Sequence, residues 1–324
     1  MDRIKNNRIV KWASNYVSQL LFLAFIIVVV SLLSDVFLTR TNLINVLRQI
    51  STNLYMGCAL TMILITGGID LSTGSVIAIA GMVCTYITEV AGLPFGLGLV
   101  AALCTGLLTG CISGTIIANT TLPPFIVTYS MQSILRGIVY VVTGASVIRI
   151  KNDAFLNFGG GFLGFIPLPV VYLVIIVAVT ATILNKTKLG RHMYAVGGNA
   201  KCAQYAGINI KRTRIFMYMF SGMMAALAGI VLTSRTTSMQ PTLGTGMEMD
   251  AIAAVVLGGT SMGAGLGAVG GTVIGALIIG LINNGLNLMS VDSFYQYILK
   301  GIIILAAVYM DYIKNQKLMS GAKK

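Results

Sequence analysis

Two Gly-Gly pairs, one in each half of the chain, interrupt apolar runs of membrane length and are followed by small polar residues. Gly67 and Gly68 precede Asp70, and Gly258 and Gly259 precede Thr260. Hydroxyl and carboxylate groups placed in this way can hydrogen-bond a polar solute. Backbone that leaves the helix at membrane depth is tolerated only where protein or a water-filled cavity satisfies its polar groups. Because paired interruptions mark substrate pathways in transporters, the sequence predicts a protein that moves a solute across a membrane.

Asp70 is the one carboxylate that we expect within the membrane, where an aspartate costs about 2.5–3.5 kcal/mol. In one interpretation it relays protons or contacts the solute. In the other it is structural, and Asp70 or Ser72 accepts N–H bonds from the helix that restarts there. Arg136 and Lys300 also lie in apolar spans, and both side chains are long enough to snorkel to an interface. The acids that we assign to outer loops are Asp35, Glu89, Asp153, Glu248, Asp250 and Asp292.

The composition is that of a membrane protein with many spans, since 56% of the residues are hydrophobic and 10% are charged. Repeated apolar runs of about 17–25 residues fit the length of a membrane-crossing helix. The formal net charge is +13, but the basic residues gather beside apolar spans, which is the positive-inside pattern. We therefore expect no nucleic-acid partner. The ten predicted spans cover residues 16–34, 50–66, 74–90, 96–118, 125–143, 167–184, 214–232, 251–262, 269–288 and 295–311.

The distribution of lysine and arginine predicts the topology. These residues crowd the loop 185–213 and the C-terminal tail 312–324. With ten spans, both regions lie on the same side as the basic N-terminal tail 1–15, and the positive-inside rule assigns that side to the cytoplasm. The chain is then one transmembrane domain, 1–324, in which residues 16–184 carry the first six spans and residues 214–311 carry the rest.

A short repeat relates the two halves. Residues 134–138 read Ile-Leu-Arg-Gly-Ile in the fifth span, and residues 298–302 read Ile-Leu-Lys-Gly-Ile in the tenth. Five spans per half would place the copies in opposite orientations, as in inverted-repeat transporters. The predicted fold is all-α, with about ten transmembrane helices in two inverted five-helix halves and broken helices at the Gly-Gly motifs. In span four, Gly106, Gly110 and Gly114 share one face and predict close approach of a neighbouring backbone.

The basic loop contains a predicted short helix. Asn199 is a suitable N-cap for it and Gly207 a suitable C-terminal stop. Ala200, Ala203 and Ala206 share one face of that helix, and this small face would fit a cleft on a partner. A simple re-entry turn is the alternative. The sequence has no Gly-Lys P-loop and no metal-ligand spacing among its five cysteines, so if ATP drives transport, another chain hydrolyses it.

Several specific motifs lie within residues 20–312, the part of the chain that resembles a known family. They are Thr66-Gly67-Gly68-Ile69-Asp70-Leu71-Ser72, Tyr194-Ala195-Val196-Gly197-Gly198-Asn199, Ala206-Gly207-Ile208, Gln240-Pro241-Thr242, Asp250-Ala251-Ile252-Ala253-Ala254-Val255-Val256-Leu257-Gly258-Gly259-Thr260-Ser261 and Asn283-Asn284-Gly285-Leu286-Asn287. Through these motifs the chain resembles the permease subunits of monosaccharide ATP-binding cassette (ABC) importers, of the ribose, galactoside and xylose type. Ribose permeases are the most similar of these, especially through Gln240-Pro241-Thr242, Asn283-Asn284-Gly285-Leu286-Asn287 and Phe294-Tyr295-Gln296.

The resemblance implies a bacterial inner-membrane permease for a monosaccharide, ribose first, that carries out no reaction itself. It implies a homodimer, an ATPase subunit with two nucleotide-binding halves that holds ATP and Mg, and an extracytoplasmic sugar-binding protein. A proton-coupled sugar transporter that uses Asp70 is the alternative, although such proteins usually carry several ionisable residues along one path. The expected pathway residues are Thr66, Gly67, Gly68, Asp70, Ser72, Thr73, Gly258, Gly259, Thr260, Ser261, Asn283 and Asn284. The expected ATPase-coupling residues are Gly197, Gly198, Asn199, Ala203, Ala206, Gly207 and Ile208.

Overall fold

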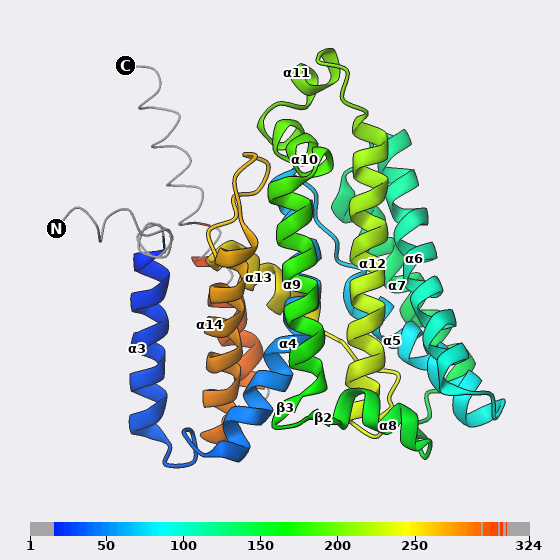
Figure 1. Ribbon diagram of the computed structural model, residues 1–324, viewed down its shortest axis with the longest axis vertical. Helices are drawn as coiled ribbons and strands as arrows, with labels where there is room; N and C mark the ends of the chain where they lie inside the picture. Colours follow the sequence, from blue (N-terminus) through cyan, green and yellow to red (C-terminus); the bar gives the residue numbers. More distant parts are fainter. Residues whose placement is uncertain (1–15, 293, 304, 307–308, 310–324) are drawn as a thin grey trace.

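The structure, a computed structural model, describes residues 16–292, 294–303, 305–306 and 309. Most helices run along the long axis of the molecule (Figure 1). The predicted tails 1–15 and 312–324 lie outside the described residues. The longer helices are α3 (Val17–Leu33), α4 (Arg40–Ile65), α5 (Thr73–Thr85) with its π-helical continuation η1 (Tyr86–Val90), α6 (Phe95–Asn119), α7 (Pro124–Thr143), α9 (Leu168–Lys186), α12 (Ile210–Arg235) and α14 (Val269–Leu288).

Shorter elements connect these helices. Strand β1 (Ile148–Arg149) pairs with β4 (Ser238–Met239), and β2 (Phe162–Leu163) pairs with β3 (Ile166–Pro167), both antiparallel. Residues 294–303 are also helical. The short helices are α8 (Asp153–Gly160), α10 (Lys188–Gly198), α11 (Ala200–Tyr205) and α13 (Met247–Leu257).

The prediction of an all-α membrane protein is confirmed. Among the described residues, six helical segments are long and apolar enough to cross a membrane: Thr73–Val90, α6, α7, α9, α12 and α14. α3 is a shorter apolar helix. Each of the ten predicted spans overlaps a described helix, although α13, with 11 residues, is too short for a hydrocarbon core of about 30 Å.

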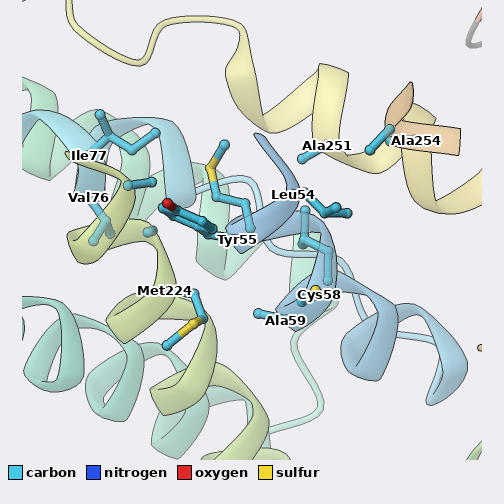
Figure 2. Close-up of a cluster of buried hydrophobic side chains, with 14 of the residues drawn as sticks. Leu54, Tyr55, Cys58, Ala59, Val76, Ile77, Met224, Ala251 and Ala254 are labelled. Carbon is cyan, nitrogen blue, oxygen red and sulfur yellow. The ribbon is translucent and has the colours of Figure 1, made fainter. Parts of the chain in front are cut away.

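Helix α4 forms the centre of the bundle. Its residues from Ile50 to Ile65 are all buried, polar ones included. It packs against α9, α12, α13 and α14. Figure 2 shows side chains of α4, such as Tyr55, meeting Ile77 of α5, Met224 of α12 and Ala251 of α13. A helix that is buried all round explains why α4 combines apolar residues with small ones rather than showing one apolar face.

Close packing between α6 and α12 depends on glycine, as the sequence predicted. A Cβ at Gly106 would overlap the backbone of Gly222, and one at Gly110 would overlap the backbone of Tyr218. At Gly114 an added Cβ would lie 3.0 Å from the Cα of Ile215. The prediction that a neighbouring backbone approaches this face is confirmed. Small residues allow this approach, which brings dispersion contacts between helices that no hydrophobic effect drives together in lipid.

Helices end at both Gly-Gly pairs. α4 stops at Ile65, and the chain turns through Gly67, at φ +84°, before α5 begins. α13 stops at Leu257, and the chain turns through Gly259, at φ +85°. A residue with a Cβ is strained at such positive φ values, so glycine is required where each helix is interrupted.

Candidate functional site

A cavity of about 770 Å³ lies between α4, α12, α13, α14 and the helix 294–303. Its volume is in the range of about 300–1,000 Å³ that is typical of small-molecule sites. Side-chain amides, hydroxyls and charges around it offer both hydrogen-bond donors and acceptors. Residues that contribute these groups include Gln49, Asn53, Asp250, Asn283, Gln296 and Lys300.

The cavity is remote from the short helices α10 and α11. It meets α4 near Asn53, about a dozen residues and therefore roughly 18 Å before the helix ends at Ile65. It meets α14 at Asn283, well beyond the start of that helix at Val269. In Figure 1, α10 and α11 lie at the upper end, whereas α4 begins at the lower end.

An ion pair forms part of the cavity wall. The Nζ of Lys300, in the helix 294–303, lies 2.9 Å from Oδ2 of Asp250 in α13. The same oxygen accepts a hydrogen bond from Nδ2 of Asn283 in α14, at 3.1 Å. The Asp250 side chain is 8% exposed and that of Lys300 is 27% exposed. Lys300 thus neutralises a nearly buried carboxylate and remains partly open to the cavity, instead of snorkelling to an interface as the sequence suggested.

A second buried acid begins the same helix. Glu248 is 5% exposed and accepts a hydrogen bond at Oε1 from Nε2 of Gln132 in α7, at 3.0 Å. The assignment of Glu248 and Asp250 to an outer loop was therefore wrong, because the first turn of α13 is packed inside the bundle. Asp70 is consequently one of at least three buried acids.

Arg136 is also held inside the bundle rather than snorkelling. Its Nη1 donates to the carbonyl oxygens of Pro241 and Leu243, at 2.6 and 2.9 Å, and its Nη2 donates to the carbonyl of Gly74, at 3.0 Å. Glu248 is near enough for the two charges to attract. The guanidinium therefore ties the segment before α13 to the start of α5.

The Asp70 carboxylate has neutral partners close by. Its Oδ1 accepts hydrogen bonds from the backbone N–H of Ser72, at 3.0 Å, and from the Ser72 hydroxyl, at 2.6 Å. Its Oδ2 accepts from the hydroxyl of Ser221 in α12, at 2.7 Å. Asp70 is 2% exposed. This arrangement ties the start of α5 to α12, which is the geometry expected of a structural role.

The two glycine breaks meet each other. The N–H of Gly263 donates to the carbonyl of Leu64, at 3.0 Å, and the N–H of Gly265 donates to the carbonyl of Ile65, at 3.3 Å. A Cβ at Gly67 would lie 3.2 Å from the Cα of Gly263. The last carbonyl groups of α4 therefore accept hydrogen bonds from the loop that follows α13.

The predicted pathway residues around these breaks are tightly packed. A Cβ at Gly68 would lie 2.8 Å from the Tyr218 hydroxyl, and one at Gly258 would overlap the backbone of Gly271. Thr66 donates its hydroxyl to the carbonyl of Ile63. The side chains of Ser72, Thr73, Thr260 and Ser261 are all buried. In this conformation Gly68 and Gly258 are buried, whereas Gly67 and Gly259 are exposed.

The two predicted asparagines of α14 have different surroundings. Asn283 lines the cavity and bonds Asp250. Asn284 exchanges two hydrogen bonds with Asn42 of α4, at 2.9 and 3.1 Å, and both residues are buried. Of the twelve residues predicted for the pathway, Asn283 is therefore the one that lines this cavity.

The loop after α9 adopts the predicted short helix. Oδ1 of Asn199 accepts the N–H of Cys202, at 3.0 Å, which makes Asn199 the N-cap of α11. Gly207 follows the helix at φ +82°, and Ile208 donates its N–H to the carbonyl of Ala203, at 3.1 Å. The N-cap and C-terminal stop are confirmed.

The predicted small face does not all point outward. Ala203 is 5% exposed, whereas Tyr205 is 90% exposed. Ala206 and Gly207 are exposed. The Ala203 side chain packs within its own chain in this conformation, and the fit of this small face to a partner's cleft stays a prediction. Tyr205 is the largest of the exposed side chains of α11, which also include Lys201, Cys202 and Gln204, and the sequence alone did not single it out.

Helix α10 contacts both breaks. A Cβ at Gly197 would overlap the carbonyl oxygen of Ile65 and lie 2.8 Å from the Cα of Gly265, while one at Gly198 would meet nothing within 4 Å. The hydroxyl of Tyr194 donates to the carbonyl of Gly267, at 2.9 Å. Motion of α10 would consequently displace the end of α4 and the loop after α13.

The matching repeats contain a signal for the burial of Glu248 and Asp250, which the sequence had led us to assign to outer loops. Arg136 and Lys300 are the cations of the two Ile-Leu-X-Gly-Ile copies. Both lie beside the first turn of α13, Arg136 near Glu248 and Lys300 on Asp250. Two cations at equivalent positions of a repeat indicated two acids to be neutralised.

Residues 42–308 match the family described as branched-chain amino acid transport system / permease component. The ribose import permease of Haemophilus influenzae is 42% identical over 93% of this chain and 95% of its own length. The ribose import permease of Bacillus subtilis is 41% identical over 90% of this chain and 91% of its own. The D-allose transport system permease of Escherichia coli is 36% identical over 90% of each. No solved structure matches the chain.

Proposed function

The chain belongs to the family of transport-system permease components, and from that premise we propose that it is the membrane permease of an ABC importer for a monosaccharide, ribose first. The observation that carries this proposal is identity of 41–43% with ribose import permeases over nine-tenths or more of the chain. A permease of this kind moves its solute unchanged, so the chain is not an enzyme.

The cavity wall offers partners to the hydroxyl groups of a sugar. Hydroxyl groups need both hydrogen-bond donors and hydrogen-bond acceptors. Gln49, Asn53, Asn283 and Gln296 provide both in the cavity wall, and Tyr297 adds an aromatic ring. We infer that the cavity is one section of the sugar pathway.

The glycine breaks are proposed as the gate of that pathway at the α10 end. Gly67, Gly68, Gly258 and Gly259 lie where two helix ends meet, and the polar side chains of Thr66, Asp70, Ser72, Thr73, Thr260 and Ser261 surround them. The backbone bonds there run from the loop after α13 to the last carbonyl groups of α4, so this loop can separate from α4 without unwinding a helix. Separation would extend the cavity toward the α10 end.

Coupling to ATP is proposed to act through α10 and α11. Residues Gly197 to Ile208 would dock on an ATPase subunit, with Tyr205 as the exposed contact. When the ATPase halves close on ATP and Mg, movement of this loop would shift α10. Because Gly197 packs on Ile65 and Gly265, the shift would move both breaks together.

The remaining parts of the proposal concern assembly and topology. We propose ten spans in two inverted halves, with both termini and the loop 185–213 in the cytoplasm. Two copies of the chain would assemble with an ATPase that has two nucleotide-binding halves and with an extracytoplasmic sugar-binding protein. The cavity lies away from α10 and α11, and the external protein would deliver sugar on that side.

Uptake into right-side-out membrane vesicles tests the proposal. Vesicles with the chain, its ATPase and the external binding protein should accumulate D-ribose, D-allose or L-arabinose when ATP is supplied to the cytoplasmic face. Vesicles without the ATPase should accumulate none of them. Accumulation without the ATPase, driven by a pH gradient, would instead support the proton-coupled alternative, for which the structure adds the buried acids Glu248 and Asp250 as candidate carriers.

A further inference from the structure

We infer that the Asp250–Lys300 pair, with Asn283 beside it, is a binding site for two adjacent hydroxyl groups of the sugar in the cavity. The inference rests on the proposed function and adds to it the residues that recognise the substrate within the membrane. It concerns the permease itself, rather than the external protein that delivers the sugar.

The first argument is the placement of the pair. Asp250, Lys300 and Asn283 come from three different helical segments, and all three line the same cavity. A nearly buried carboxylate is costly unless it is paired and hydrogen-bonded. Here the pairing is asymmetric, since both contacts made by the described residues, from Lys300 and from Asn283, go to Oδ2.

The second argument is the bonding capacity that remains. An ionised carboxylate accepts several hydrogen bonds over its two oxygens, and an ammonium group donates three. With Oδ2 used twice, Oδ1 keeps its acceptor capacity, and Lys300 keeps donors beyond the one on Asp250. A sugar hydroxyl can donate to Oδ1 while its neighbour accepts from Nζ. Hydrogen bonds to charged groups are shorter and stronger than neutral ones.

The third argument is that the pair does not resemble the purely structural charges of the same region. Arg136 donates hydrogen bonds to the backbone carbonyls of Pro241, Leu243 and Gly74, and thereby joins two segments of the chain. Lys300 makes no such backbone contact among the described residues, and its side chain is 27% exposed toward the cavity. Its charge is therefore available to a solute.

The test compares sugars as well as variants. Uptake of D-ribose, 2-deoxy-D-ribose and 3-deoxy-D-ribose is measured in cells that contain the chain with its ATPase and external binding protein, at saturating sugar. In Asp250→Asn, the preference for D-ribose over the deoxy sugar that lacks the contacted hydroxyl should fall by about tenfold. Lys300→Gln should lower the same preference. Because the external protein is identical in all strains, its own selectivity cancels between variants.

Lys211→Gln is the matched control, since the Lys211 ammonium bonds Asn119 on the exposed surface, at 2.9 Å, far from the cavity lining. This variant should keep the wild-type preference. Membrane levels of each variant are measured in parallel. If Asp250→Asn and Lys300→Gln are inserted and both keep the wild-type preference, with or without slower uptake, the pair is structural and the inference is overturned. If the wild-type chain takes up no monosaccharide at all, the proposed function is overturned with it.

Discussion

The N–H of Gly263 donates to the carbonyl oxygen of Leu64 at 3.0 Å, so the interruptions in the two halves of the chain are bonded to each other. Gly265 makes the same kind of bond to Ile65. Carbonyl groups at the end of a helix need hydrogen-bond partners inside a membrane. Because N–H groups of the loop after α13 bond the carbonyls of Leu64 and Ile65, the position of one break depends on the position of the other.

Gly197→Ala should uncouple α10 from these breaks. The new methyl group would overlap the carbonyl of Ile65 and press on Gly265, and overpacking of this kind costs about 1–3 kcal/mol. We expect ATP-driven uptake to fall by about tenfold or more, measured as the initial rate in vesicles. Gly198→Ala is the control, because its Cβ would meet nothing within 4 Å. Equal uptake in the two variants would show that contact between α10 and the breaks has no part in transport.

Gly259→Val should abolish uptake while the protein still inserts. Gly259 has φ +85°, where a side chain stores about 1–3 kcal/mol of strain, and an added Cβ would lie 3.2 Å from Gln19. Gly92→Val is a matched control, because Gly92 also has positive φ, +65°, but lies in open space. Uptake and membrane level are measured for both. Normal uptake by Gly259→Val would exclude this break from the gate.

The positions of the helices and of both breaks could be predicted from the sequence. The length of each apolar run and the position of each glycine pair determine the backbone of the same segment, without contacts to distant residues. The cap at Asn199 and the glycine face of α6 followed for the same reason. The cavity did not, because it forms between helices that are far apart in the sequence. Asp250 looked like a loop residue at the edge of an apolar run. Its burial depends on Lys300, 50 residues later, and only the Ile-Leu-X-Gly-Ile repeat hinted at that partner.

Tyr205→Ala should weaken binding of the ATPase. Tyr205 is 90% exposed on α11, and a large aromatic ring at the centre of an interface typically contributes 2 kcal/mol or more, which corresponds to about thirtyfold in affinity. Co-purification of the ATPase with the detergent-solubilised chain measures the effect. Lys201→Ala, exposed on the same helix, is the control and should be milder. If both variants retain the ATPase equally, α11 is a connector rather than a docking site.

Ala203→Leu should act differently from Tyr205→Ala. Because Ala203 is 5% exposed, the larger side chain would displace α11 from its own chain before it reached a partner. We expect a lower thermal midpoint of the isolated permease in detergent, together with weaker ATPase binding. An unchanged midpoint with weaker binding would instead show that this small face meets the partner directly.

Asp70→Asn separates a structural role from proton transfer. The asparagine carbonyl can accept the two bonds from Ser72, and the Ser221 hydroxyl can rotate to accept from the new amide. We therefore expect ATP-driven uptake to remain within about threefold of wild type. Asp70→Leu, which removes every acceptor, should lose folding or insertion. Loss of uptake in correctly inserted Asp70→Asn, with a pH gradient as the driving force, would favour the proton-coupled alternative.

The native Cys202 provides a test of topology. It lies exposed on α11, within the loop that the clustered lysines and arginines assign to the cytoplasm. In a variant whose other four cysteines are replaced by serine or alanine, a membrane-impermeant maleimide should label Cys202 in permeabilised cells but not in intact cells. Asp153→Cys in the same background is the control. Asp153 is exposed at the start of α8, near the opposite end of α12 from α11 (Figure 1), and it should be labelled in intact cells. The reverse labelling pattern would mean that the chain has the opposite orientation in the membrane, with α11 on the outer face. A cytoplasmic ATPase could then not bind α11, and the proposed coupling would be excluded.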